Sequence, residues 1–389
     1  MNPTKPAAMS PPVHIVLAAA IAATLSGCGS DAPESLQNPS MAWPPAQAVA
    51  AHRGASALRP EHTLAAYQKA IEDGADIIEP DLVITKDGVL VARHENDITG
   101  TTNVATVSQF ASRKSTKSID GIPVTGWFTE DFTLAELKTL RAKERIPANR
   151  PANTAFDGQF EVPTLQEVID LVKKESVARN KVIGIYPETK HPTYFKAIGL
   201  PLEKRLIEVL TASGYRGKTA AVFIQSFEVA NLKQLRTMTD MRLVQLIDNP
   251  TNLPAPNGAP RNAPYDAVAA GSKTSYADMV TPAGLKDIAT YANVVAPYKE
   301  VIIRRTSANE LGTPTSFVAD AKAAGLQVHT WTLRPENPFL PVSLRKPDTA
   351  SPSQRGDSVA EIQAYLKAGI DGFFTDDPAV GRAAVAAFK

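Results

Sequence analysis

The sequence predicts a single (β/α)8 barrel, and three observations support this fold class. Apolar runs of strand length alternate with amphipathic segments of helix length along most of the chain. Several of these runs end in polar residues, and parallel barrels place their functional side chains at the carboxyl ends of the strands. The 389 residues could form two domains, but barrels of this class often exceed about 250 residues as one domain.

The number of strand-like runs is one too many for eight strands. Nine runs lie near residues 49, 78, 90, 183, 222, 244, 294, 328 and 372. The second and third runs can be separate barrel strands or two pieces of a hairpin, and the sequence leaves the strand order open.

The amino terminus has the pattern of an export signal. Residues 13–25 form an apolar run of thirteen, which is shorter than a membrane span and typical of a signal-peptide core, with Lys5 before it. The run ends in LSGC, which resembles a bacterial lipoprotein box with Cys28 as the lipidated residue; an ordinary signal peptide with an incidental cysteine is the alternative. We expect residues 1–27 to be a signal peptide and residues 28–45 a flexible tether. The protein would then be exported to the periplasm and meet a membrane only through a lipid anchor.

Composition excludes two classes of function. The formal net charge is +1 and no basic run is present, so binding to nucleic acid has no electrostatic support. Cys28 is the single cysteine, so the rest of the chain has neither a disulfide nor a thiolate site. The hydrophobic content of 43% is enough for a large core.

The first predicted strand, residues 48–51, ends at His52 and Arg53, so two polar side chains stand at the carboxyl edge of a strand. Gly54 permits a sharp exit from that strand. Residues 60–63 (PEHT) then open a helix whose apolar positions follow a period of 3.6 residues.

The second strand, residues 77–84, carries two acids. Glu79 and Asp81 are two residues apart, so they project to the same side of an extended chain. Two carboxylates side by side in an apolar strand repel each other, so a cation is expected between them. A hard divalent ion meets that need.

A second histidine reaches the same region, because the apolar run 89–92 is followed by Arg93 and His94. Together with His52, Arg53 and the acidic pair, it completes a set suited to metal-assisted phosphoryl chemistry. The ion and the guanidinium would stabilise phosphate charge while the imidazoles move protons. Each residue alone can also be a core histidine or a member of an ordinary ion pair, but that alternative weakens when all of them stand at strand ends.

The motifs of this stretch are HRG at 52–54, PEHT at 60–63, ExD at 79–81, TKDG at 85–88 and the valine-rich run into His94. They resemble the glycerophosphodiester phosphodiesterase family, most closely its periplasmic branch. The resemblance implies a TIM barrel, a divalent metal held by the acidic pair and a later glutamate, and the two histidines as general acid and base. The family usually has Asp after its second histidine, whereas Glu95 follows here.

An insertion of about residues 97–161 interrupts the alternation after His94. Insertions of this length in a barrel usually form a functional loop or subdomain over the active face. The resemblance places an insertion at the same point, where it shapes the pocket around the glycerol end of the substrate. Trp127 and Phe128 can line that pocket or simply pin the insertion to the barrel.

The next strand, residues 181–186, is followed by Glu188 and Lys190. Glu188 stands at a strand end, and the resemblance makes it the third metal ligand. Lys190 is a candidate phosphate partner, with a solvated loop lysine as the alternative. His191 matches no motif and is interpreted as a loop residue.

Two more polar or aromatic residues stand at later strand ends. Gln225 is a candidate substrate ligand or a turn-stabilising amide, and Trp331 offers a ring on which a glycerol or head-group methyl could rest. His329, two residues before Trp331, is expected in the core. The loop 248–279 can be a lid, a pocket wall or disordered. The passage from GIDG to TDDP near the end resembles the family's last strand, and its aspartates cap the closing helix.

These expectations combine into one hypothesis. Glu79, Asp81 and Glu188 hold one Ca²⁺ or Mg²⁺, because carboxylates alone disfavour zinc and do not separate the other two ions. Arg53 and the metal grip a glycerophosphodiester, His52 acts as base and His94 as acid, and the products are an alcohol and glycerol 3-phosphate. A related enzyme that cuts intact phospholipid and a lipoprotein that only binds phosphorylated ligands are the alternatives. The oligomeric state stays open.

Overall fold

The computed structural model describes residues 43–250, 262–347 and 351–388. These residues belong to one compact unit. The predicted signal peptide, Cys28 and most of the predicted tether lie outside the described residues, so those expectations stay predictions. Within the described ranges, no helix is both long enough and apolar enough to cross a membrane.

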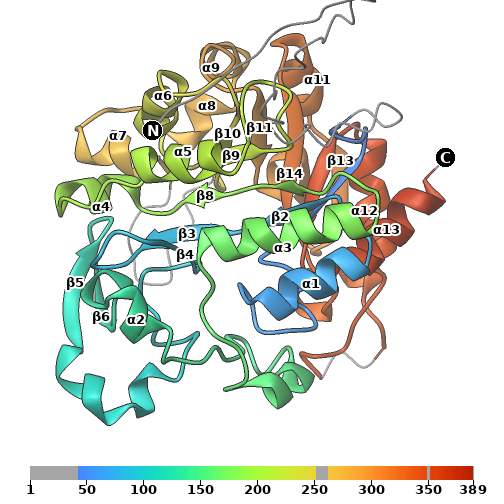
Figure 1. Cartoon of the computed structure of the whole chain (residues 1–389). Coiled ribbons are helices and arrows are strands. Elements are labelled where there is room, and N and C mark those ends of the chain that lie inside the picture. Colours follow the sequence, from blue (N-terminus) through green and yellow to red (C-terminus); the bar gives the residue numbers. More distant parts are fainter. Residues whose placement is uncertain (1–42, 251–261, 348–350, 389) are drawn as a thin grey trace, which may run out of the picture. The chain divides into compact units, whose positions relative to one another are not determined.

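Within the described residues, eight parallel strand positions form a closed ring, and the prediction of a (β/α)8 barrel is confirmed. In order around the ring they are β1 (Ala48–His52), β2 (Ile77–Glu79) continued by β3 (Asp81–Ile84), β7 (Gly184–Ile185) continued by β8 (Glu188–Thr189), β9 (Phe223–Ser226), β10 (Arg242–Ile247), β11 (Val294–Pro297), β14 (Gln327–Leu333) and β15 (Gly372–Thr375). The ring closes because β1 pairs in parallel with both β15 and β2. Figure 1 labels most of these strands.

Proline interrupts two of the eight positions. Pro80 separates β2 from β3, and Pro187 lies between β7 and β8. Proline has no backbone N–H to give to the ladder, so each strand breaks there. Pairing continues on both sides of the breaks, since β2 pairs with β7 and β3 pairs with β8. The two breaks fall next to the predicted metal ligands Glu79, Asp81 and Glu188.

The third apolar run, near residue 90, forms one strand of a hairpin. β4 (Leu90–Ala92) pairs antiparallel with β3, with Leu82 opposite Ala92 and Ile84 opposite Leu90. The turn between these strands is too short for the crossover that a parallel neighbour requires. β4 therefore lies outside the ring.

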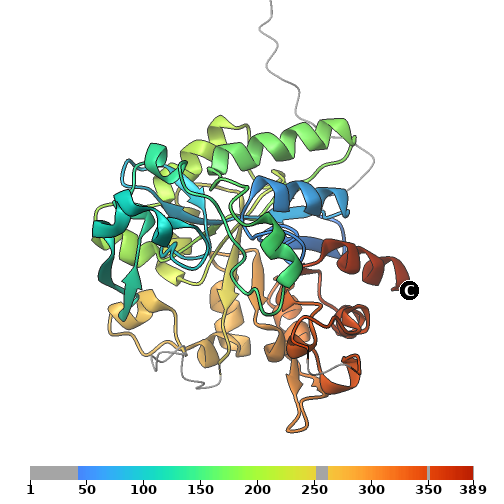
Figure 2. The same ribbon diagram turned by 90° about the horizontal axis from the view of Figure 1, so that it is seen from below.

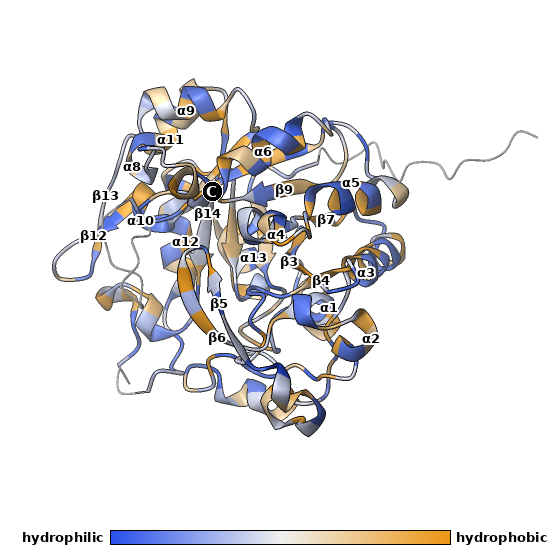
Figure 3. Cartoon of the chain, turned by 90° about the vertical axis from the view of Figure 1, so that its left-hand side faces the viewer, coloured by the Kyte–Doolittle hydropathy of each residue, from blue (hydrophilic) through white to orange (hydrophobic). Residues whose placement is uncertain are grey.

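Helices follow the strands and lie outside the ring, as the view from below shows (Figure 2). The longer ones are α1 (Leu64–Glu72), α3 (Leu165–Ala178), α5 (Glu203–Ala212), α6 (Val229–Arg236), α9 (Pro282–Ile288), α11 (Phe317–Ala323), α12 (Ser358–Lys367) and α13 (Pro378–Ala387). Both hydrophilic and hydrophobic residues occur along α3 and α5 (Figure 3), as expected for helices with one buried face.

Side-chain caps explain where several helices begin. Thr63 accepts a hydrogen bond from the backbone N–H of Ala66 at the start of α1. Thr164 and Glu167 form a capping box at the start of α3. Asp377 accepts from Val380 at the start of α13, so the predicted carboxylate cap is confirmed.

The core has two parts because alternate strand residues face opposite sides of the sheet. Val49 and Ala51 of β1 join the cluster between sheet and helices, whereas Ala48 and Ala50 join the cluster inside the ring. His329 is buried beside the inner cluster, with Nδ1 3.0 Å from the hydroxyl of Tyr186. His329 is thus a core histidine, as predicted.

The stretch between β4 and α3, which contains the predicted insertion, has little regular structure. Its elements are η1 (Val104–Thr106), η2 (Ser108–Arg113), β5 (Ser115–Ile119), β6 (Ile122–Gly126), η3 (Thr129–Asp131), α2 (Leu134–Leu137) and η4 (Pro151–Phe156). Trp127 is buried and its Nε1 donates to the carbonyl of Phe110 at 2.7 Å. Phe128 is also fully buried, so both rings hold the insertion in place by packing in the interior.

Short elements fill the remaining connections. They are α4 (Pro192–Ala197), α7 (Tyr265–Ala269), α8 (Tyr276–Met279), α10 (Lys299–Ile302), β12 (Ile303–Arg305), β13 (Leu311–Pro314), η5 (Asn337–Phe339) and η6 (Val342–Leu344). The predicted loop 248–279 thus contains α7 and α8 in its described part.

Candidate active site

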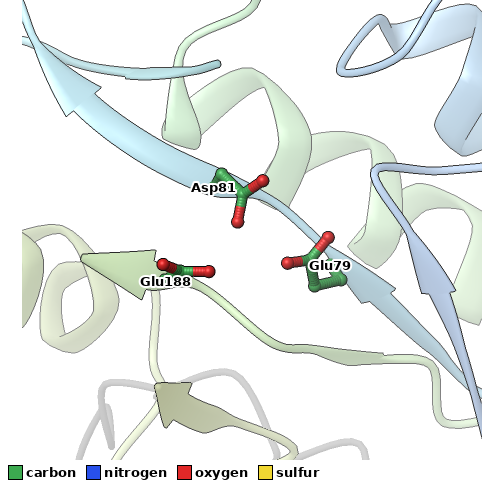
Figure 4. Close-up of side chains that lie close together, drawn as sticks. All are labelled: Glu79, Asp81 and Glu188. Carbon is green, nitrogen blue, oxygen red and sulfur yellow. The ribbon is translucent and has the colours of Figure 1, made fainter. Parts of the chain in front are cut away.

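Three buried carboxylates meet where the interrupted strands break. Glu79 ends β2, Asp81 begins β3 and Glu188 begins β8. Asp81 and Glu188 are register partners on neighbouring parallel strands. One carboxylate oxygen from each residue lies within 4.8 Å of the other two, and the three groups point toward one another (Figure 4). The sequence prediction that these acids come together agrees with this arrangement.

The electrostatics of this cluster favour a cation. Burial and the neighbouring carboxylates raise the pKa of Glu79 well above its usual range and that of Glu188 to about 8. Burial also opposes ionisation of Asp81, but the hydrogen bond and charge of His62 hold the pKa of Asp81 well below its usual range. Among the described residues, Asp81 Oδ1 is buried without a hydrogen-bond partner. A free buried oxygen and an all-carboxylate donor set fit a hard divalent ion.

Neighbouring groups fix the other oxygens of the cluster. The backbone N–H of Arg53 donates to Glu79 Oε2 at 2.7 Å, and Gln225 Nε2 donates to Glu79 Oε1 at 2.9 Å. Lys190 Nζ lies 3.0 Å from Glu188 Oε1. Gln225 therefore orients a candidate metal ligand. Its predicted contact with substrate, like that of Lys190, stays a prediction.

His62 orients the third carboxylate. Its Nε2 lies 2.9 Å from Asp81 Oδ2 and its Nδ1 lies 2.7 Å from the hydroxyl of Tyr67. The residue is fully buried and has a positive φ of 55°, which is uncommon for a side chain of this size. In the sequence, His62 was identified only as part of the PEHT motif, and its contact with Asp81 was not predicted.

His52 ends β1 and is the register partner of Glu79 on β2. Its Nδ1 lies 2.5 Å from Asp376 Oδ1. With Nδ1 donating to this carboxylate, Nε2 is the ring nitrogen that can accept a proton. Burial and the charge of Arg53 lower the pKa of His52 to about 4, although Asp376 opposes this shift, so His52 is neutral at neutral pH.

Asp376 is held from its other side by two arginines. Arg150 Nη2 donates to Asp376 Oδ2, and Arg334 Nε lies 3.1 Å from the same oxygen. Arg150 comes from the insertion and also donates through Nε to Glu336 at 2.7 Å. From the sequence, Asp376 was expected only to cap the closing helix, and no motif indicated a role for Arg150.

His94 follows β4 and its side chain is 29% exposed. Its Nδ1 lies 2.9 Å from Glu95 Oε1, and Glu95 Oε2 lies 2.8 Å from Nε2 of His191. His191 Nδ1 in turn lies 2.6 Å from Asp120 Oδ2 in the turn between β5 and β6. Burial and the cations Arg53 and Lys190 lower the pKa of His94 to about 3. His191 lies in a loop, as predicted, but it links His94 to the insertion, which the sequence did not indicate.

Arg53 lies between the acid cluster and the first helix. Its Nη1 is 3.2 Å from both carboxylate oxygens of Glu61, and its Nε is 3.5 Å from Asp81 Oδ2. Arg145 of the insertion also donates to Glu61 at 2.8 Å. The pairing with Glu61 keeps the guanidinium at the acid cluster, where it can meet a phosphate.

Trp331 lies farther along the barrel mouth. Its Nε1 donates to the carbonyl of Ala296 at 3.0 Å. Its ring centroid is 5.7 Å from that of Phe227, and Lys190 Nζ lies 5.8 Å from the Phe227 ring. Trp331 therefore reaches the acid cluster only through Phe227 and Lys190.

Comparison with known proteins identifies the family. The sequence profile described as "Glycerophosphoryl diester phosphodiesterase family" matches residues 52–380, which include every one of these side chains. The chain belongs to this family. The resemblance drawn from the HRG, PEHT and ExD motifs is confirmed, while the assignment to a periplasmic branch stays a prediction.

Relatives in this glycerophosphodiester phosphodiesterase family span most of the chain. Glycerophosphodiester phosphodiesterase GDPD6 of Arabidopsis thaliana is 36% identical over 339 residues, which cover 84% of this chain and 82% of that protein. A glycerophosphodiester phosphodiesterase of Haemophilus influenzae is 28% identical over 389 residues, covering 94% and 96% of the two chains.

Solved structures of the family support the fold. The glycerophosphodiester phosphodiesterase of Agrobacterium tumefaciens matches with a TM-score of 0.52 at 17% identity, covering 87% of this chain and 99% of that one. A phosphodiesterase of Oleispira antarctica in complex with the product sn-glycerol-3-phosphate matches with a TM-score of 0.53 at 17% identity, covering 87% and 97%.

Proposed function

We propose that this protein is a metal-dependent hydrolase that cuts glycerophosphodiesters into an alcohol and sn-glycerol 3-phosphate. The observation that carries the proposal is the buried cluster of Glu79, Asp81 and Glu188 with an unpartnered oxygen of Asp81. Family membership and the names of the relatives support the reaction, and the Oleispira enzyme is described with this product.

The three carboxylates would hold one Ca²⁺ or Mg²⁺. When bound, such an ion supplies positive charge to the phosphodiester oxygens. Arg53 adds a guanidinium beside the cluster, and Lys190 adds an ammonium. Burial would lower the pKa of Lys190, but Glu188 and the other nearby acids raise it on balance, so Lys190 stays charged.

The two histidines would move the protons. His52 accepts the proton of the attacking hydroxyl at Nε2, because Asp376 holds its Nδ1–H. The bond between phosphorus and the alcohol oxygen breaks, and His94 gives its proton to the leaving oxygen. Burial and the cations Arg53 and Lys190 lower the pKa of His94, so a bound phosphodiester anion that offsets their charge would favour the protonated imidazole. The attacking hydroxyl belongs to water or to the glycerol of the substrate itself, in which case water opens a cyclic phosphate in a second step.

The acid and base assignments follow from the surroundings of each imidazole. His52 is buried and fixed by a buried carboxylate, which suits a base that accepts a proton from a positioned hydroxyl. His94 is 29% exposed and pairs with Glu95, which is 46% exposed, so His94 can exchange protons with solvent between turnovers. A lipoprotein that only binds phosphorylated ligands would need neither imidazole.

The amino-terminal pattern adds a proposal about location. Export and lipidation at Cys28 would place the enzyme at a membrane in the periplasm. Mass spectrometry of the mature amino terminus tests this proposal, because a diacylglyceryl group on Cys28 is expected. An amino terminus that lacks Cys28 or carries an unmodified thiol would contradict it.

Hydrolysis of glycerophosphocholine and glycerophosphoethanolamine, with each divalent ion in turn, tests the reaction. We expect sn-glycerol 3-phosphate, measured by its dehydrogenase, to appear with the free alcohol only when an ion is present. Intact phosphatidylcholine serves as the comparison substrate. If only the intact phospholipid were cut, the alternative of a lipid phosphodiesterase would replace the proposal.

A further inference from the structure

A cavity of about 220 Å³ lies beside the active site, and our catalytic proposal does not use it. Its walls come from the end of β14, from α10 and β12, and from η5, and they include Trp331, Arg334, Lys299, Arg305 and Phe339. The proposed reaction does not explain why three cations line this cavity.

Two of the walls connect the cavity to the catalytic groups. Arg334 Nε lies 3.1 Å from Asp376 Oδ2, and the other oxygen of Asp376 holds His52. On the other side, the Trp331 ring contacts the Phe227 ring, which lies 5.8 Å from Lys190 Nζ beside the acid cluster. The cavity therefore adjoins the catalytic groups on the sides of Arg334 and Trp331.

The charge balance of the lining is positive. Lys299, Arg305 and Arg334 are cations, and Glu300 is the acid among the lining residues. Behind the wall, Lys299 Nζ at 2.9 Å and Arg305 Nη2 at 2.5 Å share one oxygen of Glu361. A single carboxylate thus serves two cations and Arg334 pairs with Asp376, so cations outnumber acids among the residues that line the cavity but not among the residues behind them.

Arg305 also has an unsatisfied donor. Its side chain is 10% exposed, and its Nη1 is buried without a hydrogen-bond partner among the described residues. A buried guanidinium N–H is unfavourable without an acceptor, so an acceptor that reached Arg305 from the cavity would stabilise it. The planar, doubly donating guanidinium is suited to carboxylate or phosphate oxygens.

Resting on the proposed function, we propose that this cavity is a subsite for a negatively charged group on the alcohol part of the diester. A carboxylate or a phosphate on that alcohol would meet Arg305, with Lys299 and Arg334 on either side. The enzyme then prefers glycerophosphodiesters whose alcohol carries a carboxylate or phosphate over those of choline or ethanolamine, which offer these cations no acceptor.

A pair of substrates that differ by one carboxylate tests this preference. Glycerophosphoserine carries that carboxylate and glycerophosphoethanolamine lacks it. With the metal-loaded full chain, we expect kcat/KM for the serine diester to be at least tenfold higher, mainly through a lower KM. A second pair, glycerophosphoglycerol with and without a terminal phosphate, tests the phosphate group in the same way. A preference in one pair alone identifies the group that binds, and no preference in either pair overturns the proposal.

Arg305→Gln should bring the serine to ethanolamine ratio close to one while kcat/KM for glycerophosphoethanolamine stays within about twofold. Glu361 keeps Lys299 as its partner in this variant, so the fold should tolerate the change. Arg304→Gln is the matched control, because it removes the same charge from the adjacent, exposed position of β12 and should keep the wild-type ratio. A ratio that survives Arg305→Gln contradicts the subsite. If no diester at all is hydrolysed, the proposed function fails and the subsite is not at issue.

Discussion

Asp81 and Glu188 are 107 residues apart in sequence and are paired in register on β3 and β8. The pairing brings two carboxylates together on the edge where Glu79 already points, so the cluster depends on the pairing of neighbouring strands as well as on the local ExD motif. Several properties of the enzyme follow from this arrangement.

Removal of the metal should abolish turnover. Treatment with a chelator is expected to lower activity to background, and Ca²⁺ or Mg²⁺ should restore it, because the ion would supply positive charge to the phosphodiester oxygens. Glu188→Gln should lower kcat by at least about 10²-fold and weaken metal binding measured by calorimetry, since it removes one of three ligands. Activity that is indifferent to chelation would refute the metal site.

The contribution of Glu188 to the stability of the metal-free protein should fall as pH rises. Burial raises the pKa of Glu188 to about 8, so the folded state holds a proton that the unfolded chain releases near pH 4.5. This contribution is fully present below about pH 4.5 and is lost between about pH 4.5 and 8, by at most about 5 kcal/mol at 1.36 kcal/mol per pKa unit. Buried histidines act in the opposite direction, since burial lowers the pKa of His52 to about 4, so the chelated wild type is compared with chelated Glu188→Gln at each pH. Denaturant titrations should show the stability difference between the two proteins shifting against the wild type as pH rises, and metal should restore the wild type. A stability difference that does not change with pH would contradict the raised pKa of Glu188.

Loss of either catalytic imidazole should remove activity without unfolding the protein. His52→Ala and His94→Ala are each expected to lower kcat by about 10²- to 10⁴-fold. Thermal melting should change little, because Asp376 keeps its contacts with Arg150 and Arg334, and His94 is partly exposed. Full turnover in either variant would remove that histidine from the mechanism.

Asp376→Asn tests the orientation of His52. An amide at this position no longer fixes the Nδ1–H tautomer, so kcat should fall by about 10³-fold with little change in KM. The substitution also weakens a buried ion-pair network, so activity must be measured well below the melting temperature. A variant in which KM rises and kcat is preserved would indicate a role in binding instead.

His191 connects Glu95, the partner of His94, to Asp120 of the insertion, so a change at His191 should affect both stability and activity. Burial would lower the pKa of His191, but Asp120 and Glu95 raise it to about 10, so the ion pairs stabilise the fold below about pH 6.5 and are lost as pH rises toward 10. His191→Asn in the metal-loaded protein should be less stable by about 1 kcal/mol at pH 6 and should converge with the wild type near pH 10. Its kcat should fall severalfold, because Glu95 loses the contact that aligns it with His94. Equal stability of the two proteins at pH 6 would contradict the ion pairs.

The sequence predicted most of the barrel because the signals for its parts are local. Apolar runs of strand length and capping residues such as Thr63 and Thr164 act within a few residues, so their pattern survives in the linear chain. The sequence left open whether the second and third of the nine apolar runs were barrel strands or hairpin pieces, since period and length alone do not tell a hairpin piece such as β4 from a barrel strand.

Site residues that lie at strand ends could be predicted from the sequence. Residues that only orient another side chain of the site could not. His52, Glu79, Asp81 and Glu188 each follow or interrupt an apolar run, and that position marks them. Three residues whose roles were missed lie in loops or at a helix start: Arg150, Asp376 and His191. Their roles come from contacts between distant parts of the chain. Arg150 and Asp376 are 226 residues apart, and His191 and Glu95 are 96 residues apart.

By itself, the sequence determined the fold class, the family and the candidate residues for the chemistry, because hydrophobic period and motif spacing are properties of neighbouring residues. Tertiary structure alone decided which side chains hold those residues in place, which run lies outside the ring, and that Arg305, with one N–H lacking a hydrogen-bond partner among the described residues, lines a cavity beside the site. Charges and hydrogen bonds act through space over a few ångströms, and only the closed barrel sets those distances.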